Sequence, residues 1–562
     1  MIKQLLTATM LLLVSMCSIA QSNKAEPWYT ATTVYQIYPR SFYDTDGDGI
    51  GDLKGVIEKL DYIKASGFET IWLSPFFSSP QMDFGYDISD YRGVAPEYGD
   101  TAMVTQLITA VHAKGMKIVF DMVMNHTSDQ HPWFQEARKS KDNPKHDWYV
   151  WQDGKGKRPP NNWKSQTGGS GWHYDSVAHQ YYWASFLSFQ PDLNYHNPEM
   201  KTAMLDNLRY WLDKGVDGFR LDIFNSIYED SAFHNNPFAL KVVPSETNPN
   251  GFFQKMKYTI NHPQSFAFAN ELRAVLEEYK YPPRFAVGEV FGSHEVLRQF
   301  MGEGHDGLNM VFLFEILDFK FKAKYFCKVL QTFEKEFPHP YMPTYVFSNH
   351  DRKRSISRMD NDTRKAKLLA LFQMTARGVP FTYQGEEIGM EQAYIPLKQA
   401  KDILAQKYSR IPQFIANMSS ESLNRDECRT PMQWDSTTSA GFSISSNTWL
   451  PVNNNYHRIN VAAEQRDSNS LWQVYRQLLQ LRKSSKALQS DTITVLKKMP
   501  KNVLAFQRSN AGETYTVIIN FSKKRKNVDG NEGSLLYSIG NTKLQTDQIE
   551  LGPYAGLIIK SN

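Results

Sequence analysis

Three acidic residues that could perform acid–base or nucleophilic chemistry stand where short apolar runs of the sequence end. Asp222 ends the run GFRLD, Glu289 follows FAVG, and Asp351 follows YVFSNH. Burying a carboxylate costs free energy unless it is paired, so core packing does not explain three of them at such positions. Each one taken singly could instead cap a helix that begins after a strand. Together they predict a catalytic site built from carboxyl groups.

Basic residues stand close to these acids in the sequence. Arg220 lies two residues before Asp222, so both side chains are expected on the same face of a strand. A cation there is expected to keep Asp222 ionised and to lower its pKa, as a nucleophile requires. Glu289 lies between apolar residues, which predicts a raised pKa and the role of a general acid. His126 and His350 are polar groups at two other predicted strand ends.

These side chains need a scaffold that brings the ends of several strands together. Eight apolar runs alternate with amphipathic helical stretches, and they cover residues 34–42, 68–77, 117–125, 218–224, 284–291, 308–315, 343–348 and 379–384. The alternation predicts an α/β fold with a parallel sheet, and eight units predict a closed (β/α)8 TIM barrel. Such barrels carry their active sites at the C-terminal ends of the strands. Residues 28–125 and 198–485 are assigned to this barrel.

Two regions do not show this alternation of strands and helices. Residues 126–197 are rich in Trp, Tyr, Gly, Pro and Asn and show no long helical pattern, which predicts a small inserted domain B after strand three. Short alternating runs at 492–496, 503–508, 514–520 and 557–559 predict an antiparallel C-terminal β-sandwich domain over residues 486–562.

The first twenty residues are typical of a secretory signal peptide. Lys3 supplies a positive start, residues 5–16 are apolar, and Ser18 and Ala20 are the small residues expected before a cleavage site. The apolar run is too short to span a bilayer. We therefore expect an exported protein, either periplasmic or secreted into the medium.

Composition excludes several other classes of protein. Lys and Arg number 63 and Asp and Glu 59 among 562 residues, a net charge of +4 that is too small to indicate a nucleic-acid binder. No later segment is long and apolar enough for a membrane span, and nothing indicates a protein partner. Beyond residue 20 only Cys327 and Cys428 remain, so one disulfide at most could form, and their pairing stays open.

An acidic turn near the N-terminus has the spacing of a metal loop. Hard oxygen ligands at alternating positions, together with one backbone carbonyl, suit Ca²⁺. The predicted ligands are Asp44, Asp46, Asp48, the carbonyl of Ile50, and Asp52. The loop opens like an EF-hand, but Gly55 occupies the position of the bidentate Glu. We interpret it as a structural Ca²⁺ site with Mg²⁺ as an alternative. The competing interpretation is an acidic turn that binds no metal.

Five segments carry a family resemblance. They read DMVMNH (121–126), QPDLNY (190–195), GFRLDIFN (218–225), VGEVFG (287–292) and FSNHD (347–351). In this order they resemble the motifs of the α-amylase family of glycoside hydrolases, and QPDLNY is similar to its α-glucosidase and oligo-1,6-glucosidase branch. The resemblance extends from about residue 28 to the C-terminus.

The resemblance implies a role for each acid. Asp222 would be the nucleophile that forms a β-glucosyl-enzyme, Glu289 the general acid and then the general base, and Asp351 the stabiliser of an oxocarbenium-like transition state. Two carboxyl groups about 5 Å apart would retain the anomeric configuration. The residues expected to line the −1 sugar site are Asp121, His126, Arg220 and His350.

Two further segments resemble family elements that bind a chain end. In MDFGYDISDY (82–91), Asp83 would hold the non-reducing glucose and Tyr86 would stack on it. In RDECRTPMQWD (425–435), Arg429 would pair with Asp83. A −1 pocket closed in this way would release one glucose per cut from a short oligosaccharide.

The residue after the nucleophile bears on linkage. In this branch Val accompanies α-1,6 cleavage, whereas Thr or Ala accompanies α-1,4 cleavage. Ile223 is β-branched and apolar like Val, so we favour α-1,6 bonds. A maltase, a sucrose- or trehalose-acting hydrolase, and a transglucosylase such as an isomaltulose synthase remain alternatives. The motif that marks sucrose isomerases is not evident in residues 351–359. Because all three acids are present, a non-catalytic family member is disfavoured.

Overall fold

The computed structural model of the chain describes residues 27–407, 409, 423–510, 512–530, 533–545 and 547–561. The predicted signal peptide at residues 1–20 lies outside these ranges, so export stays a prediction. Within the described ranges, no helix combines the length and the apolar character that crossing a bilayer requires.

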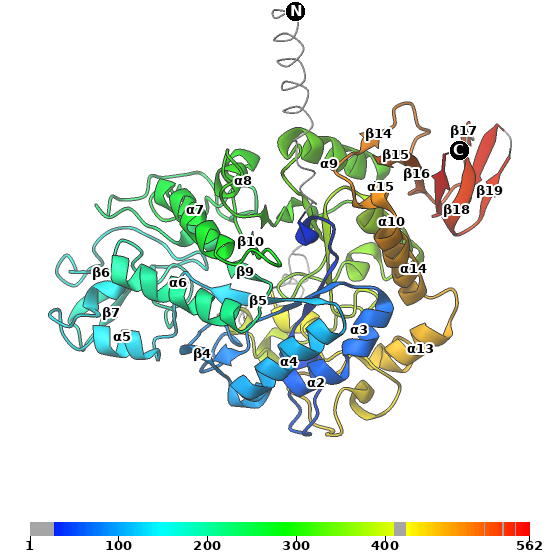
Figure 1. Cartoon of the computed structure of the whole chain (residues 1–562). Helices are drawn as coiled ribbons and strands as arrows, with labels where there is room; N and C mark the ends of the chain where they lie inside the picture. The colour runs from blue at the N-terminus through cyan, green and yellow to red at the C-terminus, as the bar shows by residue number, and fades with distance from the viewer. Residues whose placement is uncertain are drawn as a thin grey trace, which may run out of the picture.

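The centre of the molecule is a parallel eight-stranded sheet that curves into a barrel (Figure 1). Around the wall the strands follow the order β11–β10–β9–β5–β2–β1–β13–β12. Their bounds are β1 Val34–Ile37, β2 Thr70–Leu73, β5 Lys117–Val123, β9 Gly218–Asp222, β10 Phe285–Gly288, β11 Met310–Val311, β12 Thr344–Val346 and β13 Val379–Tyr383. The (β/α)8 barrel prediction is therefore confirmed.

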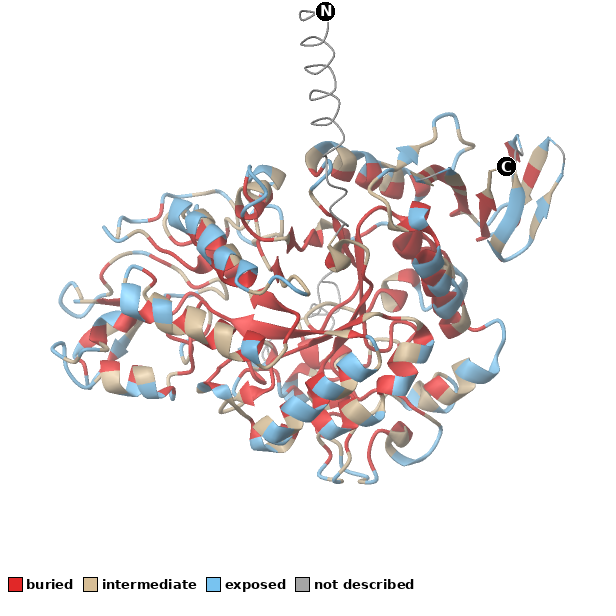
Figure 2. Cartoon of the chain, in the orientation of Figure 1, coloured by how far each residue is buried: buried red, intermediate tan, exposed pale blue. Residues whose placement is uncertain are grey.

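Amphipathic helices cover the outside of the barrel, and buried residues concentrate on the strands and on the inner helix faces (Figure 2). The main helices are α2 Leu53–Glu58, α3 Leu60–Ser66, α4 Thr101–Ala113, α6 Pro198–Asp213, α7 Pro263–Glu277, α8 His294–Met301, α9 Ala323–Glu336, α10 Thr363–Thr375 and α14 Leu471–Ser484. Polar side chains cap the N-termini of several of these helices. At the start of α6, the Asn197 side chain accepts hydrogen bonds from the backbone N–H groups of Glu199 and Met200. Lys59 separates the two consecutive helices α2 and α3.

The barrel wall has one seam, because no ladder joins β11 to β12 in the part of the chain that the structure describes. The hydroxyl of Thr344 bridges this seam: it donates to the carbonyl of Val311 at 3.0 Å and accepts from the backbone N–H of Leu313 at 3.0 Å. The strand expected over 308–315 is correspondingly short, since the chain turns into a 3-10 helix at Phe314–Ile316.

Between β5 and α6 the chain forms a small separate layer, at the left of Figure 1. Its three-stranded sheet has the order β6–β8–β7, with β6 Trp151–Gln152, β7 Trp172–Asp175 and β8 Gln180–Trp183, and the short helix α5 Pro132–Ala137 packs beside it. Three Trp side chains fill the interior of this layer and are almost fully buried: Trp163, Trp172 and Trp183.

The chain ends in two antiparallel sheets. One has the order β14–β15–β16–β21–β18 and the other β17–β20–β19. Their bounds are β14 Thr494–Val495, β15 Val503–Asn510, β16 Glu513–Asn520, β17 Lys526–Asp529, β18 Ser534–Ile539, β19 Thr542–Leu544, β20 Gln548–Leu551 and β21 Gly556–Lys560. Val528 and Leu551 from the smaller sheet share a core with Val503 and Leu557 from the larger one. Cys327 and Cys428 are both free thiols.

Candidate active site

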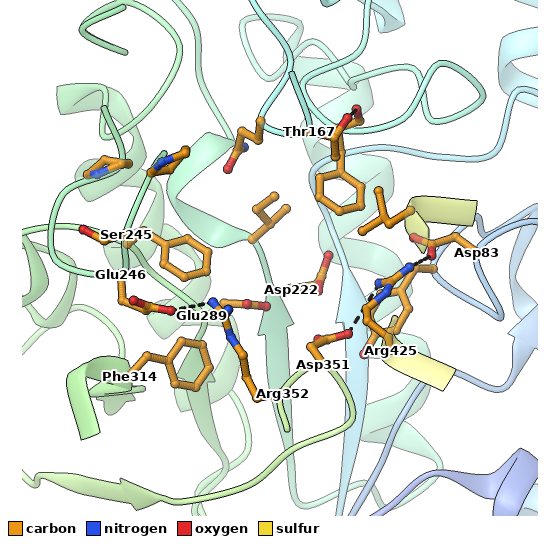
Figure 3. A pocket seen from close by; sticks show the side chains of 18 of the residues that line it. Asp83, Thr167, Asp222, Ser245, Glu246, Glu289, Phe314, Asp351, Arg352 and Arg425 are labelled. Atoms are coloured by element: carbon orange, nitrogen blue, oxygen red, sulfur yellow. Dashed lines mark hydrogen bonds and ion pairs between the residues drawn. The ribbon is translucent and has the colours of Figure 1, made fainter. Parts of the chain in front are cut away.

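A pocket of about 350 Å³ opens at the C-terminal ends of the barrel strands (Figure 3). Asp222, Glu289 and Asp351 all line it, from the ends of β9, β10 and β12. Its volume lies within the range of small-molecule sites. The structure therefore brings together the three acids that the sequence places at separate strand ends.

Arg220 is the centre of the charged network. β9 pairs with β5 so that Arg220 lies opposite Asp121, and strand alternation directs Arg220 and Asp222 to one face. The Arg220 guanidinium donates at 2.7 Å to Asp121 and at 2.7 Å to Asp222, and it also contacts the Glu289 carboxylate. Arg220 is only 2% exposed, so its charge acts on all three carboxylates with little solvent screening.

The two central carboxyl groups both hold a proton more strongly than free carboxyl groups do. Burial raises the pKa of Glu289 to about 8, and the neighbouring charge of Asp222 adds to this. Burial also raises the pKa of Asp222 to about 7, against the opposing charge of Arg220. The expected rise for Glu289 is confirmed, whereas the expected net fall for Asp222 is wrong because burial outweighs Arg220. The two groups therefore titrate as one coupled pair.

Asp351 is held as an anion. Its carboxylate accepts from Arg429 at 2.7 Å and lies 3.1 Å from Nε2 of His350. Burial alone would raise the pKa of Asp351, but the positive charges around it, those of Arg429 and Arg425 among them, bring that pKa well below its ordinary value. The surroundings therefore favour the anion of Asp351, whereas burial favours the protonated form of Glu289.

Neutral polar groups complete the deep end of the pocket. The Tyr86 hydroxyl lies 2.6 Å from Nε2 of His350 and 3.1 Å from Asp121, and the Tyr86 ring stacks on the His350 ring. His126 contacts the backbone carbonyl of Tyr86 at 3.1 Å. Burial lowers the pKa of His126 to about 4 and that of His350 to about 3, so both imidazoles are neutral at neutral pH.

The partner of Asp83 differs from the expected one. Arg425, not Arg429, donates to Asp83 at 2.7 Å, and the same guanidinium binds Asp402 at 2.7 Å. The reason is local: the 3-10 helix Arg425–Cys428 separates the two arginines and carries Arg429 on toward the end of β12. The pairing of Arg429 with Asp83 was therefore wrong, and neither Arg425 nor Asp402 was foreseen.

Part of the pocket lining comes from a segment in which only Ile223 was predicted to bear on the site. Residues 223–262 connect β9 to α7, and Ile223, Val243, Glu246 and Phe252 from this segment all line the pocket. The connection is far longer than the 2–6 residues common after a barrel strand. This length was the signal that could have identified it as part of the site.

Three acids of the predicted metal loop lie together, away from the pocket. One carboxylate oxygen from each of Asp44, Asp46 and Asp48 lies within 4.8 Å of the others. Burial raises the pKa of Asp48, and the like charges of Asp46 and Asp44 raise it further. Among the described residues none of the three forms an ion pair with Lys or Arg. A divalent cation would relieve this repulsion.

Asp52 and Ile50 take other contacts in the same loop. The Asp52 carboxylate accepts from the backbone N–H of Gly55 at 2.7 Å, which caps α2, and from both donors of Thr45. Asp52 is not part of the group that Asp44, Asp46 and Asp48 form. The backbone N–H of Ile50 donates to Asp48 at 2.7 Å.

Comparison with known proteins fixes the family. The α-amylase catalytic domain matches residues 36–491. The chain belongs to the α-amylase family. This α-amylase-family protein is 38% identical over 527 residues to an oligo-1,6-glucosidase of Parageobacillus thermoglucosidasius, covering 88% of this chain and 91% of the relative. An α-glucosidase of Apis mellifera is 38% identical over 507 residues, with 88% and 86% of the two chains covered.

The solved structures agree with this assignment. A mutant isomaltulose synthase from Erwinia rhapontici NX5 superposes with a TM-score of 0.86 at 31% identity, over 96% of this chain and all of the other. The α-amylase-family protein is therefore a glycoside hydrolase with a TIM-barrel catalytic core.

Proposed function

We propose that the protein is a retaining exo-α-glucosidase that acts on short oligosaccharides by double displacement. The observation that carries the proposal is the contact of one buried guanidinium, Arg220, with both Asp222 and Glu289 in a single pocket. One shared guanidinium keeps the two carboxyl groups near each other, which favours the retaining mechanism, since inverting enzymes leave room for a water between carboxylate and sugar.

In the first step the Asp222 carboxylate attacks the anomeric carbon, and the proton on Glu289 passes to the departing glycosidic oxygen. In the second step Glu289, now ionised, takes a proton from water, which attacks the same carbon and releases Asp222. Asp351 stays anionic throughout, since Arg429 stabilises its charge. Its charge stabilises the oxocarbenium-like transition state.

Single-glucose release is supported by the closed end of the pocket. Asp83 is 1% exposed, and its ion pair with Arg425, which also binds Asp402, stands beside the −1 site. These buried charged groups line the pocket and present hydrogen-bonding partners for the hydroxyls of a terminal glucose.

For linkage we propose a preference for α-1,6 bonds. Ile223 adopts a left-handed backbone conformation with φ of 41°, which is unusual for a β-branched residue, and its side chain lines the pocket. This conformation fixes an apolar group directly beside the nucleophile. The name oligo-1,6-glucosidase of the relatives supports the same preference. Maltose, sucrose and trehalose, or transfer to an acceptor sugar, are the alternatives.

The linkage proposal predicts faster glucose release from isomaltose than from maltose at equal concentrations. Ile223→Thr is expected to reduce the isomaltose-to-maltose ratio of kcat/KM by about tenfold, the usual scale for one altered pocket contact. Ile223→Val is the matched control and should keep the ratio. Faster release from maltose by the unaltered protein would overturn the preference, and release from neither would favour sucrose or trehalose.

We also propose a structural Ca²⁺, with Mg²⁺ as the alternative, held by Asp44, Asp46 and Asp48. Three carboxylate oxygens in close proximity suit a hard cation. The Ser443 hydroxyl donates to Asp44 at 2.5 Å. An ion on Asp44 would therefore also stabilise the contact between this loop and Ser443. It takes no part in the chemical steps.

A cation bound to the folded state must stabilise it. Saturating Ca²⁺ is expected to raise the apparent Tm of the chelator-treated protein by about 2–5 °C. Asp46→Asn should abolish the shift, whereas Asp61→Asn, at a surface acid outside the loop, should keep it. A Tm that responds to neither Ca²⁺ nor Mg²⁺ in the unaltered protein would show that the loop binds neither ion.

A further inference from the structure

We propose that the ion pair between Glu246 and Arg352 forms a polar wall where the pocket receives the leaving group, the part of the substrate that departs when the glucosidic bond is cleaved. This wall selects sugar leaving groups over apolar ones. This inference rests on the proposed glucosidase function. It gives a role to the part of the pocket that lies beyond the bound terminal glucose. Neither residue belongs to the sequence motifs that identify the family.

The pair lines the pocket near Glu289, the proposed proton donor (Figure 3). Nη2 of Arg352 lies 2.5 Å from Oε1 of Glu246, and the two side chains are 26% and 11% exposed. Arg352 directly follows Asp351, while the backbone carbonyl of Glu246 accepts from the N–H of Gly292 at 2.9 Å. The pair therefore connects the end of β12 with the segment just after Glu289, where the bond to be cleaved must lie.

The surroundings make this pair stand out chemically. Several other residues that line the pocket are apolar: Val243, Pro244, Pro249, Phe252, Phe291 and Phe314. An apolar wall discriminates poorly between leaving groups, since it offers contact area but no fixed hydrogen-bond partners. A carboxylate and a guanidinium together offer acceptors and donors, which is what the hydroxyls of a second sugar require.

The geometry also fixes what each partner contributes. Glu246 belongs to the long β9–α7 connection, and its carboxylate holds the Arg352 side chain in place in the pocket lining. Hydrogen bonds to charged groups are stronger than neutral ones, so losing them has a measurable effect on a sugar leaving group. An aryl leaving group makes no such bonds and depends on the apolar wall instead.

The test compares isomaltose with 4-nitrophenyl α-glucoside in Glu246→Gln and Arg352→Gln. In each variant the ratio of kcat/KM for isomaltose to that for the aryl glucoside is expected to fall about 10- to 100-fold. If the pair acts as a unit, the double variant should show no larger fall than either single variant. Arg352→Lys keeps the charge and should restore part of the ratio.

Arg298→Gln is the matched control, because Arg298 forms a comparable pair with Glu336 at 2.7 Å outside the pocket. This variant should leave the ratio unchanged. An unchanged ratio in folded Glu246→Gln and Arg352→Gln, or effects that multiply in the double variant, would overturn the inference. An unaltered protein that cleaves neither substrate would overturn the proposed function instead, so the two failures are distinguishable.

Discussion

Replacing Asp222 with Asn is expected to lower kcat for glucose release by about 10⁴-fold or more. The covalent route depends on a carboxylate oxygen at the anomeric carbon, and an amide of the same size cannot supply one. Arg220 keeps its contacts with Asp121 and Glu289, so the variant should fold normally. Glucose release and the Tm of the purified variant measure both expectations.

An added nucleophile provides the control for Asp222. In Asp222→Ala, azide can occupy the emptied space, attack the anomeric carbon and displace an aryl leaving group, which forms a β-glucosyl azide. Recovery of turnover with this product identifies the missing group as the nucleophile. Asp206→Asn, at an exposed ion pair with Arg209, should behave like the unaltered protein. Residual activity of Asp222→Asn above about a hundredth would contradict the assignment.

Replacing Glu289 with Gln is expected to have an effect that depends on the leaving group. For isomaltose, kcat/KM should fall about 10²- to 10⁴-fold, because the departing sugar oxygen needs a proton. For 4-nitrophenyl α-glucoside the first step should be much less affected, since that phenolate leaves without one. Equal losses on both substrates would contradict the role of Glu289 as general acid.

The same variant tests the pH dependence. In the unaltered protein kcat/KM should fall as the pH rises through about 8, the pKa of Glu289, since the acid loses its proton. It should also fall below about 7, the pKa of Asp222, since the nucleophile becomes protonated. With isomaltose, whose leaving group needs the proton, the alkaline decline should be absent in Glu289→Gln. An alkaline decline that persists there would assign it to another group.

The barrel and its three acids could be predicted from the sequence because each depends on local pattern. Apolar runs such as the one before Asp222 mark the strands, and parallel strands bring their C-terminal ends to one side of the barrel. The motifs then place Glu289 and Asp351 at that edge without any knowledge of the loops. Boundaries were less predictable: β11 is far shorter than its apolar run, because the chain turns into a 3-10 helix after Val311.

What could not be predicted depends on contacts between distant loops. Arg425 and Arg429 stand four residues apart in one motif, and only the path of the intervening turn decides which of them reaches Asp83. The sign of the Asp222 pKa shift depends on how completely the pocket buries that group. Glu246 approaches Arg352 across 106 residues of sequence, a pairing that no local pattern indicates.

The seam closed by Thr344 has a consequence for how the barrel wall moves. A backbone ladder restrains neighbouring strands at several residues, whereas the Thr344 hydroxyl restrains β11 and β12 at one point. Local opening needs the least free energy where the restraints are fewest. Asp351 follows β12 at this seam, while Asp222 ends β9, which is paired on both sides. Thermal motion of the barrel wall therefore displaces Asp351 more readily than Asp222, and so changes the distance between these two acids.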